Sequence, residues 1–125
     1  MMNKDKKQFG VWLDTQNATI VGKKINDEGT FEILGHEKVV IHENNTSEGT
    51  ANHSEITELH KFFKRVTSHM QNVDEIHVTG TGTAQEQFIK YLGETPQYKH
   101  TIAKESTSNK MSDEKLIEYI SSKFK

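Results

Sequence analysis

The spacing of the apolar residues changes along this chain of 125 residues, and the change limits which folds it can adopt. In the N-terminal part apolar and polar residues alternate, with Phe9, Val11 and Leu13 on one face and Trp12 on the other. A period of two is typical of β-strands. The polar stretches TQN and DEG separate three such segments: QFGVWLD, ATIVGKKI and TFEILGHEKVVIH. We therefore expect an antiparallel meander of three strands.

The apolar period becomes helical after Asn44. Residues three or four positions apart then form one stripe, consisting of Ile56, Leu59, Phe63, Val66 and Met70, with Phe62 beside it. The opposite face carries Glu58, Lys61, Lys64, Arg65 and His69. Such a charged face is ordinarily exposed to solvent. We then expect a strand at EIHVT, a helix from Ala84 to Leu92, a strand at KHTIA and a last helix at DEKLIEYISSKF.

Alternating strands and helices are typical of parallel crossover units. The sequence therefore predicts an α/β fold in which a mixed five-stranded sheet, antiparallel first and parallel afterwards, is covered by about three helices. We expect one domain over residues 8–125, a flexible N-terminal tail over residues 1–7, and a mobile polar loop over residues 42–55. A polar loop of this length in a small domain is often functional.

Composition excludes several classes of function. The net charge is -2 and the pI is about 6.4, so strong non-specific binding of nucleic acid is not expected. We expect no DNA partner, and any contact with RNA must come from a local patch. The chain has no cysteine, which rules out disulfides and thiolate metal sites. No apolar run approaches the roughly 18 residues that span a membrane. We expect a cytoplasmic protein without a membrane partner.

The segment HVTGTGTAQEQF has the outline of a phosphate-binding loop. The dinucleotide fingerprint needs a third glycine where this chain has Gln85, and no Gly-Lys-Ser/Thr triplet of the Walker type is present. A structural interpretation is favoured, in which Thr83 and Glu86 form a capping box and Gly80 and Gly82 allow a tight turn. The alternative is an anion site at Gly80, Gly82 and Thr83, since free amides at a helix start can hold a phosphate.

Three further constellations are too weak to predict chemistry. His53 and His60 lie about two helical turns apart, which is awkward for joint metal ligation. Asp14 ends a strand, as metal-binding carboxylates of RNase H-type nucleases do, but DTQN is also a turn opened by an aspartate. Ser54 beside His53 is better explained as a helix cap than as a nucleophile. We predict no catalytic residue, no metal site and no cofactor.

The order of the elements resembles the middle domain of the archaeal and eukaryotic class 1 peptide-chain release factors and of Pelota. It is especially similar to small stand-alone bacterial relatives with the translational-machinery-component fold. The matching stretches are FGVWLDTQNATIVGKKI, HKFFKRV and EIHVTGTGTAQEQFIKYL. The resemblance covers roughly Gln8 to Thr107. It implies an RNase H-like architecture and a role in translation.

In the release factors the loop after the third strand carries Gly-Gly-Gln, which enters the peptidyl-transferase centre and helps water to cleave peptidyl-tRNA. This chain has EGTAN at that place, so the glutamine is missing. Pelota-like relatives also lack the triplet and bind ribosomes without hydrolysis. The resemblance implies contacts with the ribosome or structured RNA from two sets of residues. These candidates are Glu48, Gly49, Thr50, Asn52 and His53 in the loop, and Lys61, Lys64 and Arg65 on the helix.

The functional hypothesis from the sequence is thus a non-catalytic, translation-associated factor that binds ribosomes or structured RNA. The resemblance implies stalled or dormant ribosomes as the setting in which it acts. Lysine and arginine would meet phosphates and position the domain. The first alternative is a protein-interaction module on the same fold, with a protein partner and without RNA binding, which the acidic pI favours. The second is a weak hydrolase, acting on peptidyl-tRNA through Asn52 or resembling RNase H through Asp14.

Overall fold

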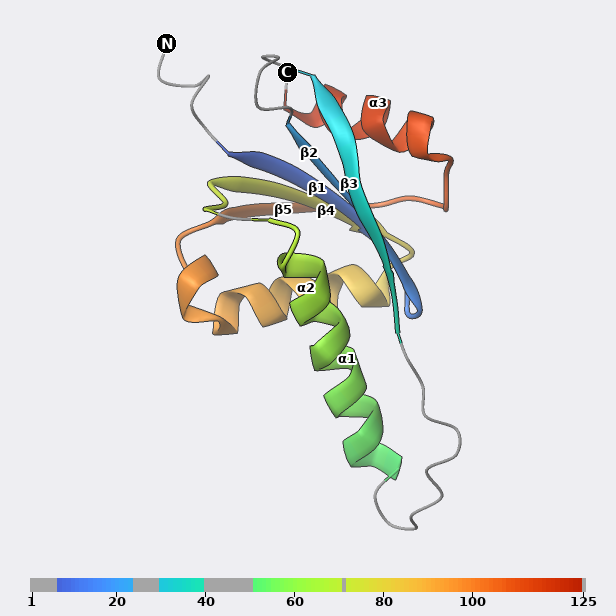
Figure 1. Cartoon of the computed structure of the whole chain (residues 1–125), viewed down its shortest axis with the longest axis vertical. Coiled ribbons are helices and arrows are strands. Elements are labelled where there is room, and N and C mark those ends of the chain that lie inside the picture. The colour runs from blue at the N-terminus through green and yellow to red at the C-terminus, as the bar shows by residue number, and fades with distance from the viewer. Residues whose placement is uncertain (1–6, 24–29, 40–50, 71, 125) are drawn as a thin grey trace.

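The computed structural model describes residues 7–23, 30–39, 51–70 and 72–124, and for residues 51–58 it describes the backbone alone. Five strands form one sheet in the order β3-β2-β1-β4-β5 (Figure 1). The strands are β1 (Gln8–Leu13), β2 (Asn17–Lys23), β3 (Phe31–Lys38), β4 (Glu75–Gly80) and β5 (Ile102–Thr107). The helices are α1 (Ala51–Thr67), α2 (Thr83–Glu94) and α3 (Asp113–Lys123), with a short 3-10 helix at Pro96–Tyr98.

The pairing of the strands confirms the predicted mixed sheet. β1 pairs antiparallel with β2, which pairs antiparallel with β3. On its other side β1 pairs parallel with β4, and β4 pairs parallel with β5. Both parallel connections contain a helix, which is the usual crossover between parallel strands. The fold class expected from the periodicity is therefore correct.

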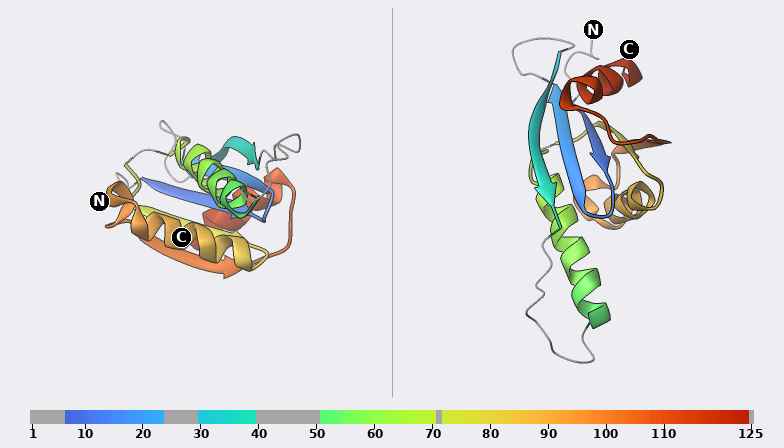
Figure 2. Two further views of the ribbon diagram at one scale, coloured as in Figure 1. Left: turned by 90° about the horizontal axis from the view of Figure 1, so that it is seen from below. Right: turned by 90° about the vertical axis from the view of Figure 1, so that its right-hand side faces the viewer.

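Alternation along β1 places apolar side chains on both faces of the sheet. Val11 and Leu13 belong to the larger core, which Phe62 and Phe63 of α1 and Phe88 of α2 complete. On the other face Trp12, together with residues of β2 and β3, packs against Leu116 and Ile120 of α3. The sheet is thus a middle layer with α1 and α2 side by side on one face and α3 on the other (Figures 1 and 2).

Two predicted strand boundaries were wrong. The strand expected at KHTIA begins only at Ile102, because the preceding residues form the 3-10 helix and a turn. The strand at TFEILGHEKVVIH ends at Lys38, and residues 40–42 of that stretch lie outside the described residues. Lys7, which we placed in the tail, is held by Asp74, whose carboxylate accepts a hydrogen bond from the Lys7 N–H at 2.8 Å.

At two turns a polar side chain accepts hydrogen bonds from backbone N–H groups. The Asp14 carboxylate accepts hydrogen bonds from the backbone N–H groups of Gln16 and Asn17, at 2.8 and 2.6 Å. This confirms the interpretation of DTQN as an aspartate-opened turn. Before α3 the Ser112 hydroxyl accepts a hydrogen bond from the Lys115 N–H, which caps the helix.

Candidate functional site

The predicted basic residues lie on α1, the helix that connects the antiparallel strands β1–β3 to the parallel strands β4 and β5. Lys61 and Lys64 are exposed, and Phe62, Phe63 and Val66 of the same helix are buried. The buried residues fix which side of the helix faces the sheet. The N-terminal part of α1 projects beyond the sheet (Figure 2).

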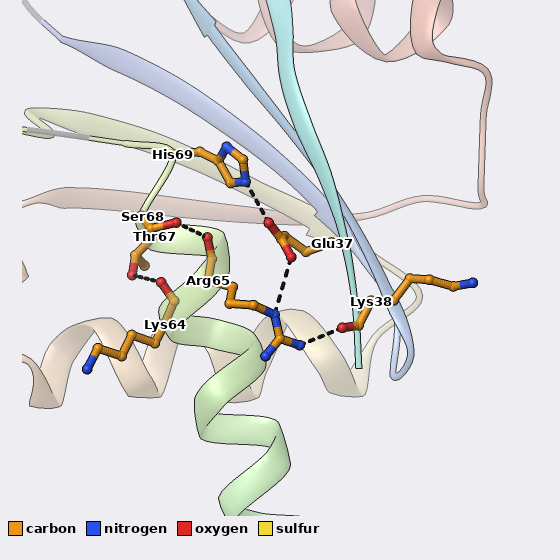
Figure 3. Close-up of polar contacts among 7 residues, drawn as sticks. All are labelled: Glu37, Lys38, Lys64, Arg65, Thr67, Ser68 and His69. Carbon is orange, nitrogen blue, oxygen red and sulfur yellow. Dashed lines mark hydrogen bonds and ion pairs between the residues drawn. The ribbon is translucent and has the colours of Figure 1, made fainter. Parts of the chain in front are cut away.

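Arg65 and His69 do not belong to this exposed face, which corrects the sequence-based expectation. Arg65 Nε donates to Glu37 Oε1 at 3.3 Å, and His69 Nε2 lies 2.7 Å from Glu37 Oε2 (Figure 3). The Arg65 guanidinium also donates to the backbone carbonyl of Lys38 at 2.6 Å. The His69 ring packs on Gly35, where an added Cβ would lie 2.5 Å from it. These contacts fasten the end of α1 to β3, so Arg65 positions the helix.

The candidates in the polar loop are only partly described. Glu48, Gly49 and Thr50 lie outside the described residues. Asn52 and His53 lie in the first turn of α1, where the backbone alone is described. Because α1 begins at Ala51, the last part of the expected 42–55 loop is helical. Ser54 is inside this helix and does not occupy its cap, so that prediction was wrong.

The glycine turn after β4 is explained by packing. An added Cβ on Gly80 would collide with the Leu13 carbonyl, and Gly82 has φ of 135°, which only glycine adopts without strain. The cap of α2 differs from the predicted Thr83–Glu86 box. The cap residue is Gly82, whose N–H donates to the side-chain oxygen of Gln85 at 2.6 Å. Thr83 is the first helical residue and is exposed.

Gln85 also ties this turn to the neighbouring strand. Its side chain is 1% exposed, and its amide donates to the Ser106 carbonyl at 2.9 Å and to Thr107 Oγ1 at 3.2 Å. The residue that breaks the dinucleotide fingerprint is thus a buried link between α2 and β5. The structure supports the turn interpretation and accounts for both glycines without a bound anion.

Sequence reasoning missed a polar network on the face of the sheet that carries α3. His77 Nε2 lies 2.8 Å from Ser106 Oγ, and the Tyr119 hydroxyl lies 2.6 Å from the same oxygen. Ser106 donates to Thr79 Oγ1 at 2.9 Å, and Thr79 in turn lies 2.7 Å from Ser108 Oγ. The members come from β4, β5, the segment after β5, and α3. The parallel register of β4 and β5 sets Thr79 opposite Ser106, and α3 adds Tyr119.

The hydrogen bonds of this network argue against a nucleophilic serine. Ser106 has one proton and gives it to Thr79, so its lone pairs accept from His77 and Tyr119. With the Ser106 proton on the side of Thr79, His77 donates to Ser106 and is not placed to act as its base. We assign the network to the packing of α3 against β4 and β5.

The surroundings of this network shift two pKa values. Burial, and then the nearby charges of Lys123 and Lys104, lower the pKa of His77 below 6.5. Burial acts to raise the pKa of Tyr119, but its hydrogen bonds to Ser106 and Thr79 and the proximity of Lys123 outweigh burial and lower it. An open cavity of about 160 Å³ lies beside His77, lined also by both lysines and Phe124.

The described residues contain neither a cluster of metal ligands nor a membrane-spanning helix. Within residues 7–23, 30–39, 51–70 and 72–124, no three His, Asp or Glu side chains gather closely enough to hold a metal ion. In the same part of the chain no helix is both long and apolar enough to cross a membrane.

No protein-family model matches the chain, and no curated protein matches it by sequence. Solved structures do share its fold. The Pelota protein of Thermoplasma acidophilum superposes with a TM-score of 0.57 at 16% identity, over 92% of this chain and 32% of that one. The archaeal translation termination factor aRF1 superposes with a TM-score of 0.58 at 13% identity, over 98% of this chain and 36% of that one.

A second Pelota structure, from Archaeoglobus fulgidus, gives a TM-score of 0.55 at 12% identity, again over 98% of this chain and 36% of that one. The fold implied by the resemblance is thereby confirmed. At such identities the likeness concerns the fold alone. The chain spans about a third of the length of each of these proteins.

Proposed function

We propose that this chain is a translation-associated factor that binds the ribosome or structured RNA without catalysing a reaction. The observation that carries the proposal is the fold. Nearly the whole chain superposes on part of a translation termination factor and on part of two Pelota proteins. A cytoplasmic place of action belongs to the same proposal.

The exposed face of α1 is the proposed contact surface. Lys61 and Lys64 are exposed there, in the C-terminal half of α1. Each lysine would neutralise a backbone phosphate and release counterions, so the affinity would be sensitive to salt. Arg65 contributes indirectly, since its bonds to Glu37 and Lys38 hold the helix that presents the two lysines. Asn52 and His53, in the first turn of α1, are the remaining residues proposed to contact the ribosome or RNA.

The absence of catalysis is proposed from the sequence. The stretch EGTAN stands where the resemblance to the release factors places Gly-Gly-Gln, so the residue that helps water attack the ester is missing. A direct test is the release of labelled peptide from peptidyl-tRNA on purified ribosomes. We expect release no faster than without the chain. Release that disappears in an Asn52→Ala variant would replace this part of the proposal with a weak hydrolase.

The binding surface is tested by reversing its charge. We would measure the affinity of Lys61→Glu/Lys64→Glu for purified ribosomes and for a structured ribosomal RNA fragment at several salt concentrations. Loss of two phosphate contacts should weaken binding and reduce the slope of log affinity against log salt by about 2. The matched control is Lys99→Glu/Lys115→Glu, which changes the net charge equally at exposed positions outside α1.

The control separates a local contact from general attraction. We expect it to bind with a salt slope close to that of the unmodified chain. Equal loss of binding in both variants would mean that net charge, and not the α1 face, governs association. Unchanged binding in the α1 variant would favour the protein-interaction module.

A further inference from the structure

A second cavity, of about 400 Å³, lies on the α3 face of the sheet. It is formed where β1, β2 and β3 meet the segment that leads into α3. Trp12, Met111 and Leu116 supply its apolar lining, and Thr19 and Asn17 add polar atoms from β2. A volume of this size is within the range of small-molecule sites, which are mostly apolar with a few polar groups.

The acidic residues around this cavity have ion-pair partners, and the lysines have none among the described residues. Of the two acidic residues along it, Glu37 turns its carboxylate to Arg65 of α1 and to His69, which follows this helix, on the other face of the sheet. Asp113 lies 3.1 Å from His36 Nε2, which carries a compensating charge only when the imidazole is protonated.

Its two lysines, Lys38 and Lys110, are exposed, and neither has an ion pair with another described residue. Because two lysines without such an ion pair face a single described carboxylate, that of Asp113, on this side of the sheet, the cavity favours an anionic group.

Trp12 provides a second, independent indication of a ligand. It lines the cavity, it is 3% exposed, and its indole Nε1 is buried without a hydrogen-bond partner among the described residues. It is the one buried side-chain nitrogen or oxygen of those residues in this state. Buried N–H groups are nearly always paired, since an unpaired one costs free energy. A ligand acceptor that reaches this nitrogen, with a small rotation of the ring, would provide the missing bond.

We propose that this cavity binds a small amphipathic carboxylic acid. The apolar part of the ligand lies against Met111, Leu116 and the Trp12 ring. Its carboxylate is held by Lys38 and Lys110 and accepts the indole N–H. This site is on the opposite face of the sheet from the surface proposed for ribosome or RNA binding, so it stands or falls independently of that proposal.

The only tryptophan of the chain is Trp12, so its fluorescence reports directly on the cavity. We would titrate the full chain at pH 7 with octanoate, 3-phenylpropionate and, as an uncharged probe of similar length, octanol. We expect a saturable change in Trp12 emission with the carboxylates, and an affinity for octanoate about tenfold or more above that for octanol. No saturable change with either carboxylate, or equal affinity for octanol, would overturn the proposal.

Variants test the assigned roles. Lys38→Glu/Lys110→Glu should weaken octanoate binding about tenfold or more, whereas Lys115→Glu, an equally exposed position of α3 outside the cavity, should leave it unchanged. Trp12→Phe keeps an aromatic ring and removes the N–H, and calorimetry should show weaker octanoate binding. Circular dichroism would verify that each variant is folded. Undiminished binding in the folded double lysine variant would refute the site.

Discussion

Gln85 is the residue whose replacement tests the structural account of the glycine turn most sharply. We predict that Gln85→Met destabilises the fold, because methionine has a similar unbranched shape but neither the acceptor for the Gly82 N–H nor the donor for the Ser106 carbonyl. The third bond, to Thr107, is the longest at 3.2 Å, and Thr107 is exposed, so water can replace it. The cost therefore comes from two hydrogen bonds.

The magnitude follows from those two bonds. A neutral hydrogen bond contributes about 1 kcal/mol net, and a partner left unpaired costs more when it is buried. Gly82 and Ser106 are both half-buried, so partial access of water keeps the total at about 2–3 kcal/mol. For a domain of this size, that corresponds to a decrease of roughly 5–10 °C in Tm.

The assay is urea unfolding followed by Trp12 fluorescence and circular dichroism. Gln87→Met is the matched control, since Gln87 is an exposed residue of the same helix, and it should change stability by less than about 0.5 kcal/mol. If Gln85→Met also stays within about 0.5 kcal/mol of the unmodified chain, Gln85 does not hold α2 to β5 and the account of the turn is wrong.

Other substitutions test single features of the fold. Gly93→Ala, at an open helical position, should stabilise by about 0.5–1 kcal/mol, whereas Gly82→Ala should destabilise by about 1 kcal/mol or more in urea unfolding. Since the pKa of His77 is lowered on folding, stability should be full above pH 6.5 and decrease as the pH falls below it; His77→Gln should show a smaller decrease. Glu37→Gln should cost about 1 kcal/mol, because its partly exposed partners Arg65 and His69 are screened, and hydrogen exchange should increase at the end of α1.

The strands of the meander could be predicted because the alternation of apolar and polar residues is a property of neighbouring residues in the sequence. Val11 and Leu13 are fully buried on one face and Trp12 is nearly so on the other, as the period of two requires. β5 has no such signal. It is an edge strand in which no residue is fully buried, and Ile102 is 50% exposed, so its start could not be placed from the sequence.

Contacts between distant parts of the chain account for the remaining differences. Arg65 was assigned to a solvated face because its neighbours in the helix are charged, yet its partner Glu37 lies on β3. The cap of α2 was shifted by one residue because Gln85 is selected by its bonds to β5 as well as by the helix start. A capping pattern inferred from residue types alone gives no information on the partner of Gln85 in β5.

The network of His77, Ser106 and Tyr119 was missed for a similar reason. His77 and Ser106 are 29 residues apart in sequence, and Ser106 and Tyr119 are 13 residues apart. None of the three belongs to a recognisable motif. Parallel pairing sets His77 opposite Lys104 and Thr79 opposite Ser106. Without the register of β4 and β5 these side chains have no reason to be considered together.

The central claim, that the chain binds ribosomes, is tested most directly by sedimentation. Purified chain would be mixed with purified ribosomes, separated on a sucrose gradient at low salt, and followed in each fraction. The account predicts that the chain sediments with the ribosomes at low salt and is released as the salt concentration rises. A chain that remains at the top of the gradient at low salt would contradict the claim.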